Sequence, residues 1–345
     1  MGDIRAQHQI TITIEQAQEV ITKHIDTVSV VSSIEELKEQ TLSNKSCVLK
    51  VSPPTPEVYQ PYTPNSLASE RTLLDHLSSK TDIPHPTVHA YDDTRTDLPY
   101  PYLLLSNPGG ISLAKAKQTG HLTERQLLFL ELKLGRELAK VHELVQMDWF
   151  GLPKQEKDEI YSWQEAFTGL LESLLEEVSD SFAASKSDGE TLPLEEIRGY
   201  LSRAIGFFLF DDCEVPSLVA FLGDESTVFI DFNPENPTRD EDIKITSLVP
   251  TAHALWGDPL LETMFMNPSK AFLEGYGKKL VLFPRQRTKR IWYDLFLALV
   301  ILVQVQRSQS EEYQGTRSEW RVEKERWARE LLYKSVKALK NAPCY

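Results

Sequence analysis

Residues 229–236 read FIDFNPEN and follow a polar, irregular stretch of the chain. Asp231 and Asn236 stand five residues apart, with Pro234 between them. A carboxylate can accept a proton and an amide oxygen can bind a hard cation, so this spacing is one that a catalytic loop uses. The two residues before the acid, Phe229 and Ile230, are apolar. Whether this is a complete catalytic loop depends on which chemical groups accompany it elsewhere in the chain.

Length and composition indicate an ordinary globular protein. The 345 residues are enough for two lobes with a large core. Lys and Arg total 37 against 51 Asp and Glu, which gives a net charge of −14. Such an acidic surface repels phosphate backbones and argues against a nucleic-acid partner. The three cysteines are scattered and show no metal or disulfide spacing, so we predict no metal held by cysteine and a reducing compartment.

The chain shows no targeting or membrane signal of the usual kinds. Its first residues contain no apolar run of the secretory type. The longest apolar run, LFLALVILV at 295–303, is too short to span a bilayer and is expected to be a buried helix. We therefore predict a cytoplasmic protein without a membrane partner, and the sequence does not indicate an oligomeric state.

Hydrophobic periodicity divides the chain into two parts. In the first part, 46–52 and 100–110 read as strands, 82–91 as an extended segment and 67–80 as a helix. Beyond residue 121 the period lengthens to that of helices, expected at 122–144, 162–182, 194–210, 259–280, 286–307 and 316–340. The prediction is an α+β fold, with a small mixed N-terminal lobe at 1–108 and a larger helical lobe at 109–345.

Four pieces of the sequence that carry chemical groups occur in a definite order. Lys50 lies on a predicted strand, Glu70 on the next helix, Asp231 and Asn236 in the opening stretch, and Asp258 in a GDP triplet. With this order the sequence resembles the aminoglycoside phosphotransferase and choline kinase group, its fungal relatives in particular. The resemblance is spread over residues 45–300 and is carried by VLKVSPP (48–54), ASERTLLDHL (68–77), IPHP (83–86), YLLLSNPGG (102–110), LGRELAKVHEL (134–144), FG (150–151), DFNPEN (231–236) and AHALWGDPLLE (252–262).

The resemblance implies a two-lobed, protein-kinase-like fold with a cleft between a small β-rich lobe and a larger helical lobe. ATP would lie against the hinge at 105–108, and a small-molecule acceptor would lie against the helical lobe. Lys50, Glu70, Ser106 and Asn236 would then mark the nucleotide site.

Three departures from the family put ATP chemistry in doubt. The catalytic loop of the family begins His-Gly-Asp, whereas this stretch has Phe229 and Ile230 before Asp231. The family's magnesium-binding aspartate stands eight residues before the aspartate of GDP, and Pro250 occupies that position here. Residues 28–50 contain no glycine for a phosphate-covering turn and instead carry Glu35, Glu36 and Glu39.

Several residues have two interpretations. Asp231 could be a general base or a turn residue, and Asn236 could be a ligand or could bond its own backbone. His253 could be an acid–base group, although a lone histidine is more often half-buried and structural. Phe229, Pro250 and Trp256 could line a dry substrate pocket beside Asp231. Phe207, Phe208 and Phe210 are expected in the core or in an acceptor pocket, and Asp258 is expected to cap a helix and brace the catalytic loop.

Three functions are compatible with these residues. The first hypothesis is a kinase fold that has lost ATP-dependent transfer and converts a small apolar metabolite by cyclisation, isomerisation or dehydration, with Asp231 and His253 as catalytic groups and no cofactor. The first alternative is an active phosphotransferase that uses ATP and magnesium on a hydroxyl or amine. The second is a pseudokinase that binds a ligand without catalysis.

Overall fold

The structure is a computed structural model, and its chain contacts group the residues into two compact units. Unit 1 comprises Met1–Glu57, Ser66–Leu130 and Glu225–Thr251, and unit 2 comprises Val58–Asn65, Glu131–Asp224 and Ala252–Tyr345. The boundary predicted at residue 108 does not coincide with this division, because residues 109–130 and 225–251 group with the N-terminal part. The residues described are 12–26, 29–31, 47–52, 60–153, 159–184, 192–233, 239–248, 251–277, 283–309 and 319–343.

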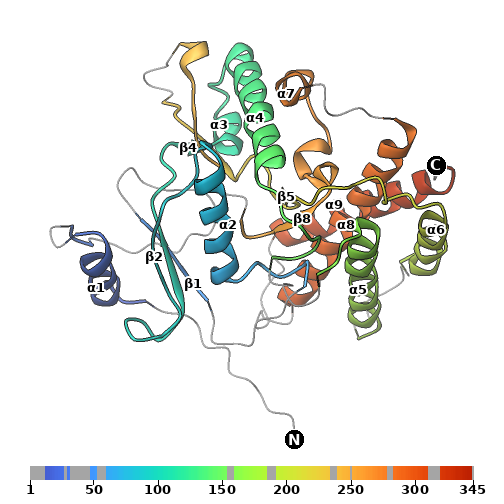
Figure 1. Ribbon diagram of the computed structural model, residues 1–345, viewed down its shortest axis with the longest axis horizontal. Coiled ribbons are helices and arrows are strands. Elements are labelled where there is room, and N and C mark those ends of the chain that lie inside the picture. The colour runs from blue at the N-terminus through green and yellow to red at the C-terminus, as the bar shows by residue number, and fades with distance from the viewer. Residues whose placement is uncertain are drawn as a thin grey trace, which may run out of the picture. The chain divides into compact units, whose positions relative to one another are not determined.

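A three-stranded antiparallel sheet carries Lys50 in unit 1. Its strands are β1 (Val48–Val51), β2 (Val88–Asp92) and β3 (Tyr102–Leu105), in the order β1-β3-β2. Helix α2 (Leu67–Lys80) lies alongside this sheet (Figure 1) and begins at Ser66, whose side chain accepts a hydrogen bond from the Ser69 N–H. The predicted helix at 67–80 and its antiparallel strands are thus present.

Helix α1 (Ile14–His24) is an element of unit 1 that the periodicity did not indicate. Thr13 and Gln16 form a capping box at its start. Val20 packs with Leu98, Tyr102 and Leu104, so the helix covers part of the same sheet.

A second small sheet of unit 1 contains the opening stretch. Its strands are β4 (Ile111–Ser112), β6 (Val228–Ile230) and β7 (Ile245–Leu248), in the order β4-β6-β7. Strands β6 and β7 are antiparallel, and Phe229 stands opposite Ser247 on one side and Ser112 on the other. Helix α3 (Leu113–Thr119) follows β4, and helix α4 (Glu124–Leu144) continues into unit 2.

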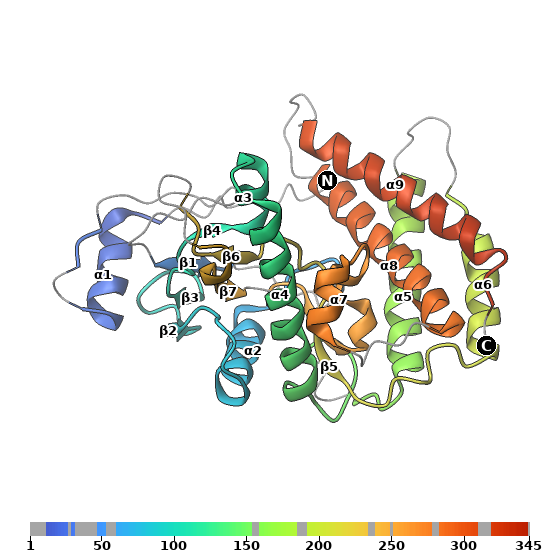
Figure 2. The ribbon, with the colours of Figure 1, turned by 90° about the horizontal axis from the view of Figure 1, so that it is seen from above.

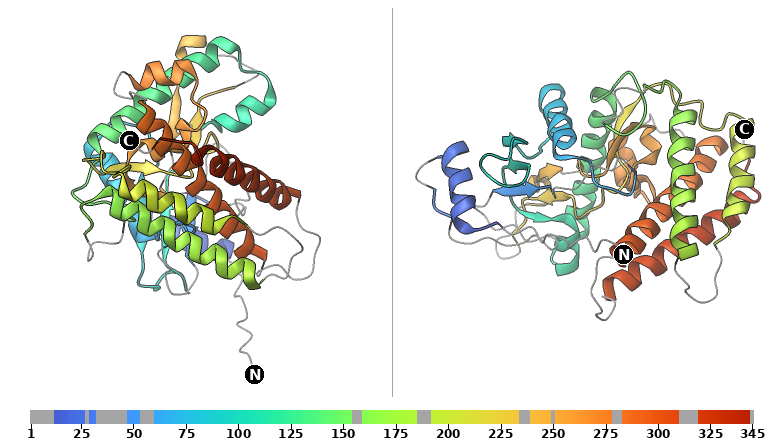
Figure 3. Two further views of the ribbon diagram at one scale, coloured as in Figure 1. Left: turned by 90° about the vertical axis from the view of Figure 1, so that its right-hand side faces the viewer. Right: turned by 90° about the horizontal axis from the view of Figure 1, so that it is seen from below.

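Unit 2 has a mainly helical core. Helices α5 (Trp163–Ala184), α6 (Leu194–Gly206), α8 (Pro284–Gln309) and α9 (Glu319–Leu339) pack side by side, as Figures 2 and 3 show. The apolar run at 295–303 lies in α8 and is buried except for the partly buried Ile301, as predicted. Within the parts of the chain that are described, no helix combines the length and apolar character needed to cross a membrane.

The long helix predicted at 259–280 is absent. Residues Pro259–Leu261 and Thr263–Phe265 form single 3-10 turns, and among residues 259–277, which the structure describes, only α7 (Lys270–Tyr276) is α-helical. Pro259 and Pro268 explain the difference, because proline lacks an N–H donor and disfavours helical dihedrals in the residue before it. Before these turns, β5 (Ser217–Ala220) pairs antiparallel with β8 (Ala254–Gly257).

The phenylalanine cluster after α6 is only partly in the core. Phe210 is fully buried, whereas Phe207 and Phe208 are 56% and 61% exposed. Phe208 also has a positive φ of 53°, and Arg285 on α8 donates hydrogen bonds to the carbonyls of Phe208 and Leu209. Of the two places expected for this cluster, the core therefore holds Phe210 but not Phe207 or Phe208.

Candidate functional site

Lys50 and Glu70 form an ion pair in unit 1. Lys50 projects from β1 and Glu70 from the first turn of α2, and Lys50 Nζ lies 2.5 Å from Glu70 Oε2. The Glu70 side chain is 4% exposed and the Lys50 side chain 27%. The carboxylate is thus held inside the unit while part of the lysine side chain remains accessible.

Thr251 is a third member of this group, which the sequence analysis missed. Its hydroxyl donates to the same oxygen, Glu70 Oε2, at 2.7 Å, and Thr251 is 1% exposed. No local motif marks a threonine three residues beyond a strand as a partner of a distant glutamate, so only the folded structure reveals the contact.

The segment after β3 is tied to its neighbours by several hydrogen bonds. The Ser106 N–H donates to the Thr87 carbonyl at 2.9 Å, and Ser106 Oγ accepts from the Thr87 N–H at 2.8 Å. The Thr246 hydroxyl donates to the Gly109 carbonyl at 2.9 Å. Gly110 has a φ of 72°, and a Cβ placed on it would stand 2.0 Å from the Ile230 carbonyl oxygen. Strands β6 and β7 therefore pack directly against residues 109–110.

Asp231 does not lie in the dry surroundings that were predicted. It follows β6 in the connection to β7, its side chain is exposed, and its N–H donates to the Lys244 carbonyl at 2.9 Å. Phe229 is buried, and its backbone stands between Ser112 of β4 and Ser247 of β7 in the sheet. Asn236 and Pro250, and the segment 32–46 with its three glutamates, lie outside the described residues.

His253 and Trp256 belong to unit 2, whereas Asp231 belongs to unit 1. The His253 carbonyl accepts the Phe221 N–H at 3.1 Å, and its ring meets the Phe221 ring edge-on with centroids 5.9 Å apart. Trp256 is buried on β8 opposite Leu218. Neither unit by itself thus contains the predicted Asp231–His253 pair.

Asp224 is a second acid that the sequence analysis passed over. Residues Leu222, Gly223 and Asp224 follow β5, and they match the Gly-Asp of a His-Gly-Asp loop with leucine in place of histidine. Asp224 is exposed, and the turn before it closes through the Gly223 N–H and the Ala220 carbonyl at 3.2 Å. The Gly-Asp dipeptide was the signal that could have found it.

The strand before Asp224 is braced by a buried acid. Glu262 Oε2 accepts the Ala220 N–H at 2.8 Å and lies 3.6 Å from His142 Nε2. His142 Nδ1 in turn lies 2.8 Å from the Tyr276 hydroxyl. These groups give the end of β5 a fixed position within unit 2.

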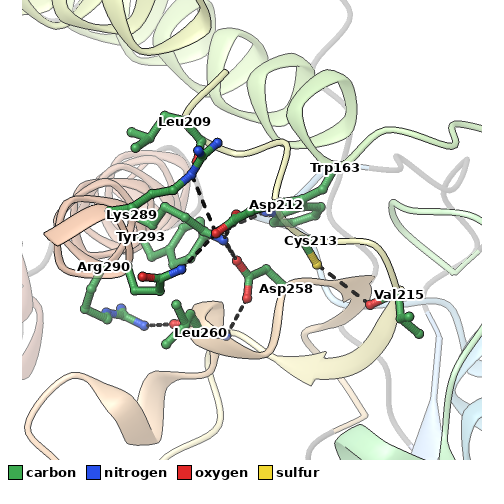
Figure 4. A network of polar contacts seen from close by, with 12 residues as sticks. Trp163, Leu209, Asp212, Cys213, Val215, Asp258, Leu260, Lys289, Arg290 and Tyr293 are labelled. Carbon is green, nitrogen blue, oxygen red and sulfur yellow. Dashed lines mark hydrogen bonds and ion pairs between the residues drawn. The ribbon is translucent and has the colours of Figure 1, made fainter. Parts of the chain in front are cut away.

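Asp258 is the centre of a buried polar network, drawn in Figure 4. It forms an ion pair with Lys289, and the Tyr293 hydroxyl donates to its Oδ2 at 2.7 Å. Its Oδ1 accepts the Leu260 N–H at 2.9 Å, so it caps the 3-10 turn that follows. The expected capping role is present, and the network fastens the end of β8 to helix α8.

Comparison with known proteins shows which family this chain is similar to. The phosphotransferase enzyme family matches residues 39–201. The matched segment is slightly less than half of the 345 residues, so the chain is similar to this family over that part. No curated protein sequence matches it.

Solved structures with the same family fold cover nearly the whole chain. A Ralstonia eutropha protein assigned as an aminoglycoside phosphotransferase is 12% identical, with a TM-score of 0.58 over 95% of this chain and 98% of that one. A spectinomycin phosphotransferase in complex with ADP and spectinomycin is 13% identical, with a TM-score of 0.54 over 95% and 99%. A Haemophilus somnus protein assigned as a fructosamine-3-kinase is 14% identical, with a TM-score of 0.52 over 92% and 97%. At these identities the likeness shows the fold.

The magnesium site implied by this phosphotransferase family does not fit the residues at the corresponding place. The sequence from Ile245 to Gly257, which contains β7 and β8, has no carboxylate. Across the described ranges, no group of three or more Asp, Glu, His or Cys side chains is arranged to hold a metal ion. The only described polar side chain shortly after β7 that contacts the Lys50–Glu70 pair is Thr251, whose hydroxyl is engaged with Glu70.

Proposed function

We propose that this protein is a small-molecule phosphotransferase, which binds a nucleoside triphosphate and transfers its terminal phosphoryl group to a hydroxyl or amine. The observation that carries this proposal is the 2.5 Å pair of Lys50 and Glu70 between β1 and α2. A strand lysine paired with a helix glutamate is the arrangement that kinases need in place for activity. The ADP and spectinomycin bound to one structural neighbour support a nucleotide and a small acceptor as ligands here.

Lys50 would bind the phosphates. A lysine ammonium has three N–H donors, and the ion pair with Glu70 uses one of them. The partial exposure of Lys50 leaves its remaining donors available to an anion. Glu70, which is buried and bonded to Thr251, would hold the ammonium in a fixed place.

An exposed aspartate would take the proton of the acceptor. As the acceptor oxygen or nitrogen bonds to the terminal phosphorus, the bond from that phosphorus to the leaving diphosphate oxygen breaks. The acceptor's proton passes to a carboxylate. Asp224 is the stronger candidate because Glu262 braces the strand before it, and Asp231 is the other.

A second candidate function is the conversion of a small apolar metabolite without ATP. It is favoured by one observation, the lack of a carboxylate between Ile245 and Gly257, which removes the family's metal ligand. The exposure of Asp231 weighs against it, because exposure does not provide the dry environment that would raise the pKa of a catalytic acid.

Transfer of labelled γ-phosphate from ATP to a pool of polyols, amino alcohols and aminoglycosides tests the proposal. We expect a labelled product with the natural protein and with Lys23→Met, which removes another lysine paired with a carboxylate in unit 1. Lys50→Met should abolish transfer. Asp224→Asn should also abolish it if Asp224 is the base, and Asp231→Asn should then retain it. Conversion of a metabolite without loss of ATP would instead favour the second candidate.

A further inference from the structure

One carboxylate oxygen in unit 1 accepts two hydrogen bonds. Glu70 Oε2 lies 2.5 Å from Lys50 Nζ and 2.7 Å from Thr251 Oγ1. Glu70 and Thr251 are 3% and 1% exposed, so solvent contributes little to holding the carboxylate. The charged donor and the neutral donor together fix the position of this oxygen.

Thr251 comes from the segment where the family resemblance implies a magnesium ligand. Strand β7 ends at Leu248, three residues before Thr251. In the family frame the metal-binding aspartate would stand at position 250, and this chain has proline there and no acid from 245 to 257. The segment thus offers Glu70 a hydroxyl and offers a metal ion no carboxylate.

We propose that the chain binds the nucleotide without a protein-held magnesium ion, and that Lys50, fixed by Glu70 and Thr251, supplies the positive charge for the phosphates. This inference rests on the proposed function, because it assumes that a nucleoside triphosphate is the ligand. Thr251 is then a positioning residue, which acts on the nucleotide through Glu70 and Lys50.

The physical basis is that a metal ion and an ammonium group need different partners in the protein. A magnesium ion at a nucleotide site is usually held by one or two protein carboxylates together with the phosphates, and this segment has no carboxylate. An ammonium needs only a fixed counter-ion on one side, and Glu70 provides it from inside the unit. A carboxylate held by two donors does not rotate freely. The position of the Lys50 ammonium is therefore fixed, and its N–H groups that do not bond Glu70 point in a constant direction.

The first test uses the natural protein alone. ATP is titrated calorimetrically in the presence of magnesium and again with EDTA. The inference predicts dissociation constants that agree within about threefold. Binding that requires magnesium would overturn the inference and leave the proposed function standing. No binding under either condition would overturn both.

The second test addresses Thr251. In EDTA, Thr251→Val should weaken ATP binding by about tenfold, the size expected for a lost hydrogen bond to a charged group. Thr251→Ser should bind ATP with nearly the affinity of the natural protein, because serine keeps the hydroxyl. Thr72→Val is the matched control, since its hydroxyl donates to the Ala68 carbonyl of its own helix α2.

The variants are compared only where their melting temperatures match that of the natural protein. Under that condition, unchanged ATP affinity in Thr251→Val would overturn the positioning role. The positioning role would also be overturned if Thr251→Ser weakened ATP binding as much as Thr251→Val does, because the hydroxyl would then make no difference.

Discussion

Glu70 Oε2 lies 2.5 Å from Lys50 Nζ, although the two residues are 20 positions apart in the chain. Both atoms belong to unit 1, and the glutamate is almost completely buried. A buried carboxylate is tolerated when it is paired and hydrogen-bonded. Thr251, which also contacts this carboxylate, comes from a segment that carries no acid from Ile245 to Gly257.

Removing the lysine should destabilise unit 1. Lys50→Met leaves the Glu70 carboxylate buried with only the Thr251 hydroxyl, which should cost about 1–3 kcal/mol of unfolding free energy after allowance for the partial exposure of Lys50. The double variant Lys50→Met/Glu70→Leu should recover part of this loss. Urea unfolding measures both, and a double variant less stable than the single one would contradict the account.

The Asp258 network should contribute more to stability than any surface pair. Lys289 has a side chain 3% exposed and lies 2.6 Å from Asp212 as well as beside Asp258. Lys289→Met leaves two carboxylates without their shared cation, and we expect a loss of about 3–5 kcal/mol. Lys337→Met, at an exposed position on α9, should change stability by less than about 0.5 kcal/mol. Equal effects of the two changes would contradict a buried network.

The same lysine should make stability depend on alkaline pH. Burial alone lowers the pKa of the Lys289 ammonium, but Asp258 and Asp212 outweigh it and raise the pKa above its usual value. The stabilisation is complete below the unfolded-state pKa of about 10.4 and is lost as the pH rises through the folded-state pKa. Unfolding midpoints followed from pH 9 to pH 12 should fall more steeply for the natural protein than for Lys289→Met. Parallel curves would show that Lys289 is not coupled to folding.

Two adjacent glycines offer a matched test of the packing around β6. Gly109 and Gly110 both have a φ of 72°, but a Cβ on Gly109 meets nothing within 4 Å, whereas one on Gly110 meets the Ile230 carbonyl. Gly109→Ala should cost about 1 kcal/mol for the backbone strain alone. Gly110→Ala should cost at least about 2 kcal/mol more, because backbone atoms must move. Similar melting temperatures for the two variants would contradict this packing.

Local patterns were sufficient for much of the fold. The helix expected at 67–80 was found at Leu67–Lys80, because its apolar stripe and its Ser66 cap are both local signals. The order of Lys50 and Glu70 also predicted their pairing. The helix expected at 259–280 failed because the prolines at 259 and 268 outweighed the apolar periodicity.

The chemical groups around the site depended on tertiary structure. Asp231 matched a spacing rule, but it lies directly after β6, in the connection to β7, with its own side chain exposed. Asp224 was marked only by the dipeptide that it forms with Gly223, and Thr251 carried no local signal. Their surroundings are set by residues distant in the sequence. Glu262 holds the strand before Asp224, and Glu70 accepts the hydrogen bond of Thr251.

The most direct test of the central claim is calorimetric titration of ATP into the natural protein and into Lys50→Met, with Lys23→Met as the control. The account predicts saturable binding of one ATP per chain to the natural protein and to Lys23→Met, and a loss of at least about tenfold in affinity for folded Lys50→Met. No ATP binding to the natural protein, or equal affinity in all three, would contradict the account.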